Sequence, residues 1–280
     1  MEREFPKDIA IRKKFMIPEA FMHPAKANWY MMEWIFDYLM EKNWLKKGDL
    51  VLDPMCGIGT TNIVTSLKGI HSIGIEYEQK FVDICLKNKK KLTQVNQEQL
   101  FQKELGKIAF LKGDARDLSI LNKIDAIITS PPYEQTMGDK HYSPRANRLM
   151  QLKKHITAYS GIRKNLKFEG KRRINYSRGD GQIGNLRKEA YLSAMLRVYQ
   201  ECYNVLKPDG VMVLITKNFV RNKEIVPLDR HTISLCERVG FKLIERHARK
   251  INYFSFWQIL RIKKNEKIVD KEDILIFQKS

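Results

Sequence analysis

The stretch Leu50-Val51-Leu52-Asp53-Pro54-Met55-Cys56-Gly57-Ile58-Gly59-Thr60 joins a short apolar run to a loop that contains two glycines. The apolar run predicts a buried strand, and the loop would then lie beyond the carboxyl end of that strand. In an open parallel sheet, ligands bind at this end of the strands. Gly57 and Gly59 carry no Cβ atom, so the backbone can turn tightly there and approach a ligand closely. The stretch therefore predicts an α/β fold with a ligand site after this strand.

Strand-like and helical patterns alternate around this stretch. Residues 28–43 repeat apolar side chains at three- and four-residue spacing, as an amphipathic helix does, and residues 79–92 form a second helical stretch. Further strands are expected at residues 72–76, 108–114, 125–129 and 211–216, with an antiparallel edge pair at 241–246 and 256–263. The alternation predicts a doubly wound, mostly parallel sheet with helices on both faces.

The composition fits one globular domain. The chain has 280 residues, of which 43% are hydrophobic. This length suits one full core with an insertion better than two complete domains. No stretch approaches the roughly 20 apolar residues that span a bilayer, and the N-terminus lacks an apolar signal core. We therefore expect a single domain over residues 1–280, located in the cytoplasm and without a membrane partner.

The formal net charge is +19 and the isoelectric point is near 9.7. Such a basic chain favours a polyanionic partner, and nucleic acid is the commonest one. A lysine-rich proteome would give the same bulk value, so charge alone leaves both explanations open.

The four cysteines, Cys56, Cys85, Cys202 and Cys236, show no C-x-x-C pairing and no histidine at the spacing of a zinc site. We expect them to be small buried side chains in a reducing compartment, and we expect no bound metal.

Acidic residues end two further predicted strands. Glu76 lies 23 residues after Asp53, where a carboxylate can accept hydrogen bonds from both ribose hydroxyls. Asp114 ends the next strand, where a carboxylate can accept from an adenine amine. A dinucleotide loop is disfavoured because Asn62 stands where a third glycine is needed, and no P-loop follows any strand. The ligand is best interpreted as an adenosine without phosphates, which indicates S-adenosylmethionine.

A second motif, Ser130-Pro131-Pro132-Tyr133, follows the predicted strand at residues 125–129. Pro-Pro is a common strand terminator and by itself would indicate only that. Together with the loop Asp53–Thr60, however, it resembles the amino-methyltransferases of nucleic acids. These enzymes methylate N4 of cytosine, N6 of adenine or, in RNA relatives, N2 of guanine. The resemblance covers roughly residues 21–219.

The resemblance implies a class I methyltransferase fold, which is Rossmann-like and has seven strands with the last one antiparallel. It also implies an upstream cofactor motif of His-Pro followed by Lys, which His23 and Lys26 fit. Lys26 or its backbone would then face the methionine carboxylate of the cofactor. The implied catalytic residues are Ser130, Pro131, Pro132 and Tyr133. The implied cofactor-binding residues are His23, Lys26, Asp53, Pro54, Gly57, Gly59, Thr60, Glu76 and Asp114.

The second motif suits the chemistry of an exocyclic amine. Such an amine is a poor nucleophile because its lone pair is delocalised into the ring. Hydrogen-bond acceptors draw its nitrogen toward tetrahedral geometry, and the Ser130 hydroxyl and the Pro131 carbonyl can serve as acceptors. The prolines stiffen the turn, and Tyr133 offers a face on which a base can stack. Enzymes that methylate carbon 5 of pyrimidines need a cysteine after the proline, and here Pro132 is followed by Tyr133, which disfavours that covalent route.

The interval 139–188 interrupts the alternation directly after this motif. It holds 14 Lys and Arg against 3 acids, with aromatic residues among them. Basic residues interleaved with aromatics suit phosphate contacts and base stacking, whereas the plainer reading is a solvated surface loop. We predict that it is a substrate-recognition insertion after the fourth strand. Its expected nucleic-acid contacts are Lys171, Arg172, Arg173 and Arg178.

The motif and its order bear on the target. In this family, Ser before Pro-Pro-Tyr favours N4 of cytosine, while Asp or Asn favours N6 of adenine or N2 of guanine. The motif order resembles the gamma arrangement of DNA enzymes, so DNA is slightly favoured as the polymer. The same methylation of ribosomal RNA, with one or two methyl groups, is the main alternative. N6-adenine methylation and a nucleic-acid-binding protein without catalysis are less favoured, and the basic insertion disfavours a small-molecule substrate.

Overall fold

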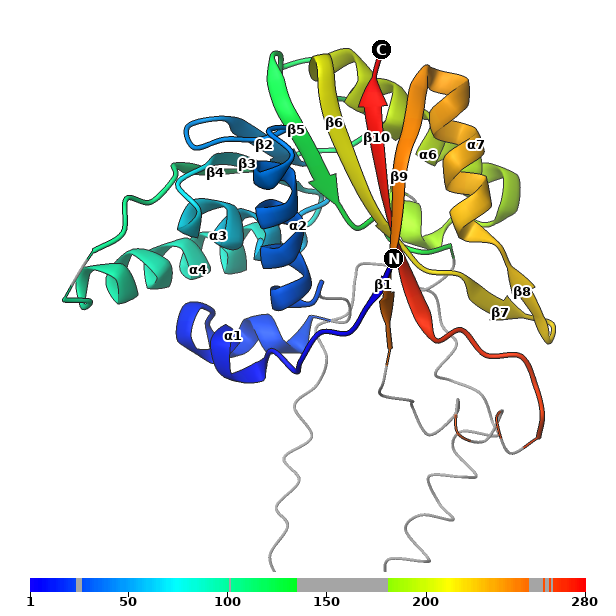
Figure 1. The fold of residues 1–280 in the computed structure, drawn as a ribbon, viewed down its shortest axis with the longest axis horizontal. Coiled ribbons are helices and arrows are strands. Elements are labelled where there is room, and N and C mark those ends of the chain that lie inside the picture. The colour runs from blue at the N-terminus through cyan, green and yellow to red at the C-terminus, as the bar shows by residue number, and fades with distance from the viewer. Residues whose placement is uncertain (24–26, 101, 135–180, 252–258, 260–261, 263) are drawn as a thin grey trace, which may run out of the picture.

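The computed structural model describes residues 1–280 except 24–26, 101, 135–180, 252–258, 260–261 and 263 (Figure 1). The strands are β1 (Glu2–Arg3), β2 (Leu50–Asp53), β3 (His71–Glu76), β4 (Ile108–Lys112), β5 (Ile124–Thr129), β6 (Leu206–Thr216), β7 (Phe219–Arg221), β8 (Glu224–Val226), β9 (Phe241–Lys250) and β10 (Lys271–Lys279). The helices are α1 (Ile9–Phe15), α2 (Trp29–Glu41), α3 (Thr60–Leu67), α4 (Gln79–Gln97), α6 (Lys188–Val205) and α7 (Leu228–Val239), with short 3₁₀ turns η1 (Pro18–Met22) and η2 (Ile183–Asn185).

Eight strands form the main sheet, in the order β1-β9-β10-β6-β5-β2-β3-β4. Strands β2 to β6 pair in parallel, whereas β10 runs antiparallel to both of its neighbours, β6 and β9. This confirms the predicted mostly parallel α/β sheet with an antiparallel last strand. Strands β7 and β8 form a separate hairpin after β6.

The expectation of seven strands is wrong by one. The additional strand is β1, whose two residues pair in parallel with Ala248 and Arg249 of β9. A Glu-Arg pair has no apolar alternation, and its pairing depends on the open edge of a strand more than 240 residues later. The local pattern therefore gave no sign of it.

The predicted edge pair is half correct. Residues 241–246 lie in β9 as expected, but the antiparallel partner of β9 is β10 and not the segment 256–263. Within that segment, the described residues Ile259 and Ile262 are helical. Strand β10 lies between two strands and is buried on both faces, so its residues 274–277 form a continuous apolar run without strand-like alternation.

Alternate residues of the strands face two separate apolar layers. In β6, Val213 and Ile215 pack in a cluster with α2, α3 and α4, whereas Met212 and Leu214 pack in a cluster with α6 and α7. Figure 1 shows these two groups of helices with the sheet between them. The period of two along a strand thus produces the doubly wound, three-layer arrangement.

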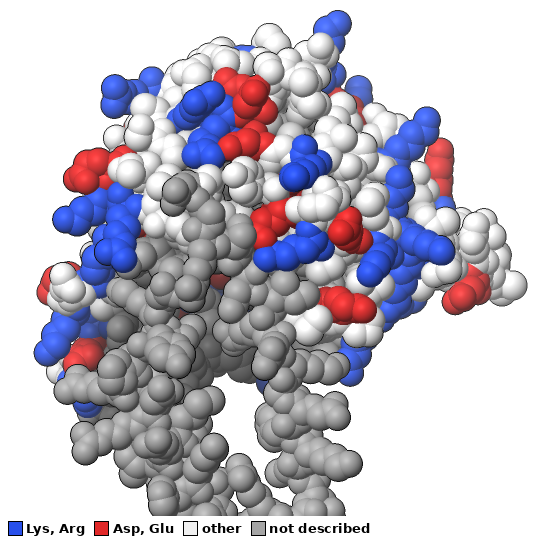
Figure 2. Space-filling view, turned by 180° about the vertical axis from the view of Figure 1, so that it is seen from behind, with Lys and Arg blue, Asp and Glu red and all other residues white. Residues whose placement is uncertain are grey.

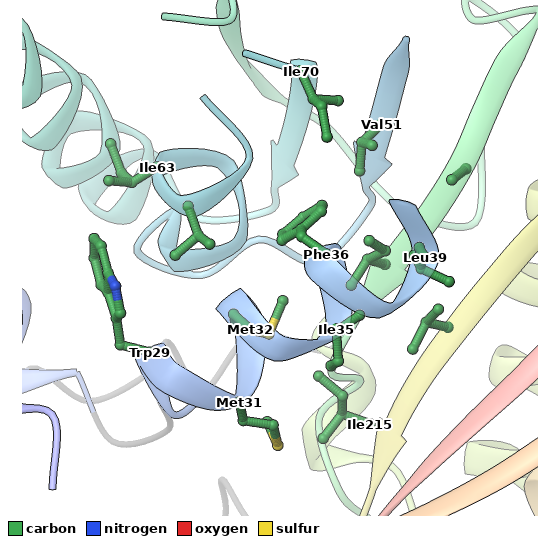
Figure 3. Close-up of a cluster of buried hydrophobic side chains, with 14 of the residues drawn as sticks. Trp29, Met31, Met32, Ile35, Phe36, Leu39, Val51, Ile63, Ile70 and Ile215 are labelled. Carbon is green, nitrogen blue, oxygen red and sulfur yellow. The ribbon is translucent and has the colours of Figure 1, made fainter. Parts of the chain in front are cut away.

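Helix α2 supplies much of the first layer. It begins after Asn28, whose side chain accepts a hydrogen bond from the Met31 backbone N–H at 3.0 Å, as an N-cap residue does. Figure 3 shows Trp29, Met32 and Phe36 of this helix directed into the core, close to the side chains of β2 and α3. Fully burying one such side chain is worth about 1.5–3 kcal/mol, so this face fixes α2 against the sheet.

No helix in the described part of the chain is long and apolar enough to cross a membrane. Within the same residues, no cluster of three or more His, Cys, Asp and Glu could hold a metal ion. The four cysteines are buried and unpaired, as expected. Two of them lie at the glycine loop, where the Cys85 thiol donates a hydrogen bond to the Gly57 carbonyl at 3.2 Å.

Candidate active site

A cavity of about 470 Å³ opens at the carboxyl ends of the parallel strands. The loop after β2 and the turn after β5 both line it, which brings the two sequence motifs to one site. These strands are hydrogen-bonded neighbours, with Val51 opposite Ala126 and Leu52 opposite Ile127. Their adjacency explains why motifs that are far apart in the sequence face the same space.

The glycine loop adopts the backbone conformation for which glycine was expected. Gly57 and Gly59 have φ angles of +56° and +75°, in the left-handed region that other residues disfavour. A Cβ atom at Gly59 would lie 2.8 Å from the Phe110 ring. The Gly59 residue also forms the N-cap of α3, so the helix N-terminus begins at the cavity.

Glu76 lies at the end of β3 and lines the cavity. Its two carboxylate oxygens accept backbone N–H groups, from Gly57 at 3.0 Å and from Glu78 at 2.9 Å. The side chain is only 7% exposed, and burial raises the pKa of Glu76 to about 7, opposed by these hydrogen bonds. The carboxylate is therefore both fixed to the loop and available at the cavity wall.

Asp53 ends β2 beneath the same loop, and Pro54 follows it along the cavity wall. Burial raises the pKa of Asp53 to about 6, while hydrogen bonds from Thr61 and the Met55 N–H act against the shift. The Met55 N–H donates to the Asp53 carboxylate at 3.2 Å. This hydrogen bond fixes the Asp53 carboxylate to the loop that follows it.

Asp114 lines the far end of the cavity, just after β4. Arg116 holds its carboxylate through several hydrogen bonds, the shortest at 2.5 Å, and the net effect lowers the pKa of Asp114 although burial opposes it. Arg116 also donates to the Gly181 carbonyl at 2.8 Å. Arg116, which was not predicted from the sequence, thus orients Asp114 and ties it to the returning end of the predicted insertion.

His23 lines the cavity and is 3% exposed. Its ring contacts Phe81 edge-on at 4.5 Å between centroids, and it lies directly against Gly57. Lys26, predicted beside it, lies outside the described residues.

Thr60 also lines the cavity, and a buried arginine holds it from behind. Arg12 is 3% exposed and donates to the Thr60 hydroxyl at 3.1 Å and to the Ala27 carbonyl. Its charge is paired with Asp8 at 2.7 Å. The burial of Arg12 was not predicted, since one of three consecutive basic residues in a short helix gives no signal that it is buried.

All four residues of the Ser130-Pro131-Pro132-Tyr133 turn line the cavity. The Tyr191 hydroxyl of α6 donates to the Pro132 carbonyl at 2.9 Å and so fixes the turn. Burial raises the pKa of Tyr133, so its phenol stays neutral. Ser130 and Pro131 both line the cavity at the head of this turn.

The chain is anchored on both sides of the predicted insertion, and on the returning side the anchor lines the cavity. At the outgoing end, the Glu134 carboxylate accepts the Lys188 N–H at 2.6 Å and pairs with Arg221 of the β7–β8 hairpin at 2.8 Å. At the returning end, Gln182 lines the cavity and donates to Glu78 at 2.7 Å.

The four predicted nucleic-acid contacts, Lys171, Arg172, Arg173 and Arg178, lie outside the described residues. On the described surface, Figure 2 shows Lys and Arg interspersed with Asp and Glu, without one dominant basic stripe on that face.

The wall residues fit an adenosine-containing cofactor. Glu76 offers a carboxylate beside a glycine loop whose backbone can approach a ligand, and the three strand ends β2, β3 and β4 contribute to one wall. These are the groups that the sequence assigned to S-adenosylmethionine.

A sequence profile of the N6/N4 methyltransferases, described as DNA methylase, matches residues 10–87 and 124–280. The chain belongs to this family. The predicted family is confirmed, and with it S-adenosylmethionine as the cofactor.

Individual relatives match over shorter stretches. A tRNA (guanine(10)-N2)-dimethyltransferase of Methanothermobacter thermautotrophicus is 32% identical over 99 residues, which are 34% of this chain and 26% of that protein. The type II methyltransferase M.HinfI of Haemophilus influenzae is 50% identical over 42 residues, 15% of this chain and 12% of the relative. The matched regions thus span about a quarter or less of these relatives' lengths.

Solved structures share the fold. A protein described as a sarcosine dimethylglycine methyltransferase, from Galdieria sulphuraria, aligns over 91% of this chain and 86% of its own, with a TM-score of 0.53 and 14% identity. One described as an RNA methyltransferase, from Pyrococcus horikoshii, aligns over 97% and 95%, with a TM-score of 0.51 and 16% identity. The class I methyltransferase fold is confirmed.

Proposed function

We propose that this protein transfers a methyl group from S-adenosylmethionine to the exocyclic N4 amine of cytosine in DNA. The observation that carries the proposal is the single cavity lined by both the glycine loop and the Ser130–Tyr133 turn. The Ser at the head of this turn supports cytosine, and the family profile along most of the chain, described as DNA methylase, supports DNA. The four buried, unpaired cysteines are consistent with action in the cytoplasm.

In this proposal Glu76 holds the ribose hydroxyls, Asp114 the adenine amine, and His23, Lys26 and Thr60 with the glycine loop hold the methionine end. When bound, S-adenosylmethionine supplies an electrophilic methyl group. The turn after β5 performs the second task, which is to position the amine. The Ser130 hydroxyl and the Pro131 carbonyl accept its hydrogen bonds, so its nitrogen lies in line for transfer. Tyr133 stacks against the base, and its neutral phenol adds no charge beside the reacting nitrogen.

The insertion at residues 139–188 is proposed as the recognition element. One end is held by Glu134, directly after the turn, and the other by Gln182 in the cavity wall. A segment of this charge that starts and ends at the cavity can contact phosphates beside the target base.

RNA is the second candidate substrate, because two relatives are tRNA (guanine(10)-N2)-dimethyltransferases. Nucleosides from a strain that lacks the gene distinguish the candidates when compared with wild type by mass spectrometry. We expect loss of N4-methyldeoxycytidine. Loss of N4-methylcytidine or of N2-methylguanosine would move the substrate to RNA, and a change in N6-methyladenine alone would overturn the assignment to cytosine.

A further inference from the structure

One cationic side chain in the cavity is used neither by the cofactor groups nor by the turn after β5. Lys217 directly follows β6, is partly buried and lines the cavity. Among the described residues, no hydrogen-bond or ion-pair partner holds its ammonium group. A donor that a cavity leaves unpaired is expected to find its acceptor on the ligand, because leaving it unmet is costly.

The position of Lys217 along the sheet indicates which ligand it meets. The cavity runs over the strand ends in sheet order, from Asp114 after β4, through the glycine loop after β2, to the Ser130–Tyr133 turn after β5. Lys217 after β6 comes next, on the side of that turn away from the cofactor groups. Glu272 of β10 follows it, since Thr216 pairs with Asp273. Lys217 therefore faces the space for the target base.

The charged neighbours of Lys217 that the structure describes do not pair with its ammonium group, so this group remains available as a donor. Glu272 is already paired with Arg249 at 2.9 Å, so its charge is largely met within the protein. Burial lowers the pKa of Lys217, Arg249 lowers it further, and Glu272 and Asp270 act in the opposite direction. An ammonium in this setting has been partly stripped of water without receiving a partner in exchange.

We propose that Lys217 positions the target base by donating a hydrogen bond to the ring nitrogen beside its exocyclic amine. This deepens the proposed function and rests on it. The turn supplies acceptors for the amine, and Lys217 supplies a donor next to them. On the Watson–Crick edge, this acceptor–donor pattern complements N4–H with N3 in cytosine, or N6–H with N1 in adenine.

Guanine does not fit the pattern on that edge, because the ring nitrogen beside its N2 amine there is N1–H, a donor. The other ring neighbour, N3, lies on the sugar edge of the base. Two donors facing each other in this partly buried site would leave both unpaired, which is a strong basis for rejecting a ligand. Lys217 is thus a specificity determinant that favours cytosine or adenine over guanine.

The test combines a protein variant with a base analogue. Lys217→Met and wild type are assayed on an oligonucleotide that carries the mapped target cytosine, or 3-deazacytosine in its place. We expect Lys217→Met to lower kcat/KM on cytosine about 10- to 100-fold, as for loss of a hydrogen bond from a charged group. The analogue should slow wild type by a similar factor and should slow the variant no further.

Lys112→Met removes an exposed lysine at the end of β4, on the adenosine side of the cavity, and serves as the matched control. It should leave kcat/KM unchanged. Binding of S-adenosylhomocysteine and the melting temperature should be the same in all three proteins, which excludes a merely structural role for Lys217. If adenine is the mapped base, 1-deazaadenine replaces the cytosine analogue.

The proposal would be overturned if the loss from Lys217→Met and the loss from the base analogue multiplied when the two are combined. It would also be overturned if Lys217→Met were as fast as wild type on cytosine. A uniform loss of affinity with a smaller salt dependence would overturn it too, since that would indicate a contact to phosphate. Methylation of guanine by wild type would also contradict it. Failure of the proposed function has a different signature, because wild type would then methylate adenine alone or no base at all, and with adenine the 1-deazaadenine test still decides the role of Lys217.

Discussion

Glu76 is the residue whose ionisation should control binding of the cofactor. Its pKa of about 7 is above the ordinary value of 4.5 because the side chain is buried, and a hydroxyl can donate fully only to the ionised carboxylate. Below pH 7 binding must therefore expel a proton. We predict that the dissociation constant for S-adenosylhomocysteine, measured by titration calorimetry, is about tenfold weaker at pH 6 than at pH 8.

Glu76→Gln is the control for this prediction. It cannot ionise, so its binding should be weaker than that of wild type at pH 8 and nearly constant between pH 6 and pH 8. Equal affinities of wild type at the two pH values would show that the carboxylate does not receive the ribose.

The same carboxyl group sets a pH dependence of stability. The unfolded chain releases the Glu76 proton near pH 4.5, whereas the folded protein keeps it until about pH 7. The folded state therefore binds more protons in this window, and the free energy of unfolding should fall as pH rises from about 4.5 to 7. Urea denaturation of the protein without cofactor should show this decline, and Glu76→Gln should reduce it. The decline in stability that remains in Glu76→Gln should come from Asp53, because burial raises the pKa of Asp53 to about 6. A stability that rises through this window would contradict the burial of both groups.

Arg12 connects α1 to the cofactor loop. Replacing it by methionine removes the hydrogen bonds to Thr60 and Ala27 and leaves the half-enclosed Asp8 carboxylate without its charge partner. We expect a loss of about 3–5 kcal/mol in the free energy of unfolding, together with weaker cofactor binding. The control is Lys13→Met, an exposed position on the same helix, which should change neither quantity. A stable Arg12→Met variant would show that the guanidinium does not hold the loop.

Gly59 of the glycine loop and Gly48, which precedes β2, allow the cost of backbone strain alone to be compared with the cost of strain plus a steric conflict. Gly59 and Gly48 have similar φ angles, +75° and +84°, but a Cβ atom at Gly59 meets Phe110 at 2.8 Å while one at Gly48 meets nothing within 4 Å. Gly48→Ala should cost about 1 kcal/mol, as expected for the left-handed conformation alone. Gly59→Ala should cost clearly more and should also weaken binding of S-adenosylhomocysteine. Equal losses in denaturation would mean that Phe110 moves aside without cost.

Helix α6 supports the turn after β5 through one hydroxyl. Tyr191→Phe removes the hydrogen bond to the Pro132 carbonyl and leaves the ring in place. We expect the rate of methyl transfer to fall by up to about tenfold, in line with the net energy of a neutral hydrogen bond, with no change in cofactor affinity. Tyr199→Phe removes a second buried hydroxyl of the same helix, away from the turn, and should leave the transfer rate unaffected. An unaltered rate in Tyr191→Phe would show that the turn holds its geometry without this contact.

Elements with a strong local signal were predictable. Strand β2 and helix α2 match the expected bounds within two residues, because an apolar run before a glycine loop and a 3.6-residue period are local properties. Strand β10 was placed wrongly because its apolar run is buried on both faces and lacks alternation. Strand β1 was missed because two residues pair only when a distant edge is present.

The same distinction applies to the site. Glu76 and the turn at Ser130 carry signals in the order of strands and in their motifs, and the cavity brings them together as expected. Arg12, Arg116 and Lys217 carry no such signal, because their importance depends on which distant residues surround them. The residues of the cavity wall could be predicted from the sequence, whereas the residues that hold the wall in position could not.

The positive charge of the protein should make its binding of nucleic acid depend on the salt concentration. Neutralising Lys171, Arg172 and Arg173 is expected to weaken binding and to reduce the slope of log K against log salt by about 2 to 3, if each residue meets a phosphate. The control neutralises Lys46, Lys47 and Lys123, which are exposed before β2 and β5 at the opposite ends of the strands. Binding measured between 50 and 200 mM salt should change only in the first variant. Unchanged affinity there would show that the insertion is not the recognition surface.

Transfer of a labelled methyl group by the purified protein tests the central claim most directly. The protein is incubated with methyl-labelled S-adenosylmethionine and with DNA or RNA, the polymer is digested to nucleosides, and the labelled product is identified. Tyr133→Ala, which still has the cofactor loop, serves as the control. We predict label in N4-methyldeoxycytidine with wild type, and none with Tyr133→Ala although its binding of S-adenosylhomocysteine is retained. Label in 5-methylcytosine, or equal transfer by both proteins, would contradict the assignment of the Ser130–Tyr133 turn as the site that holds the amine.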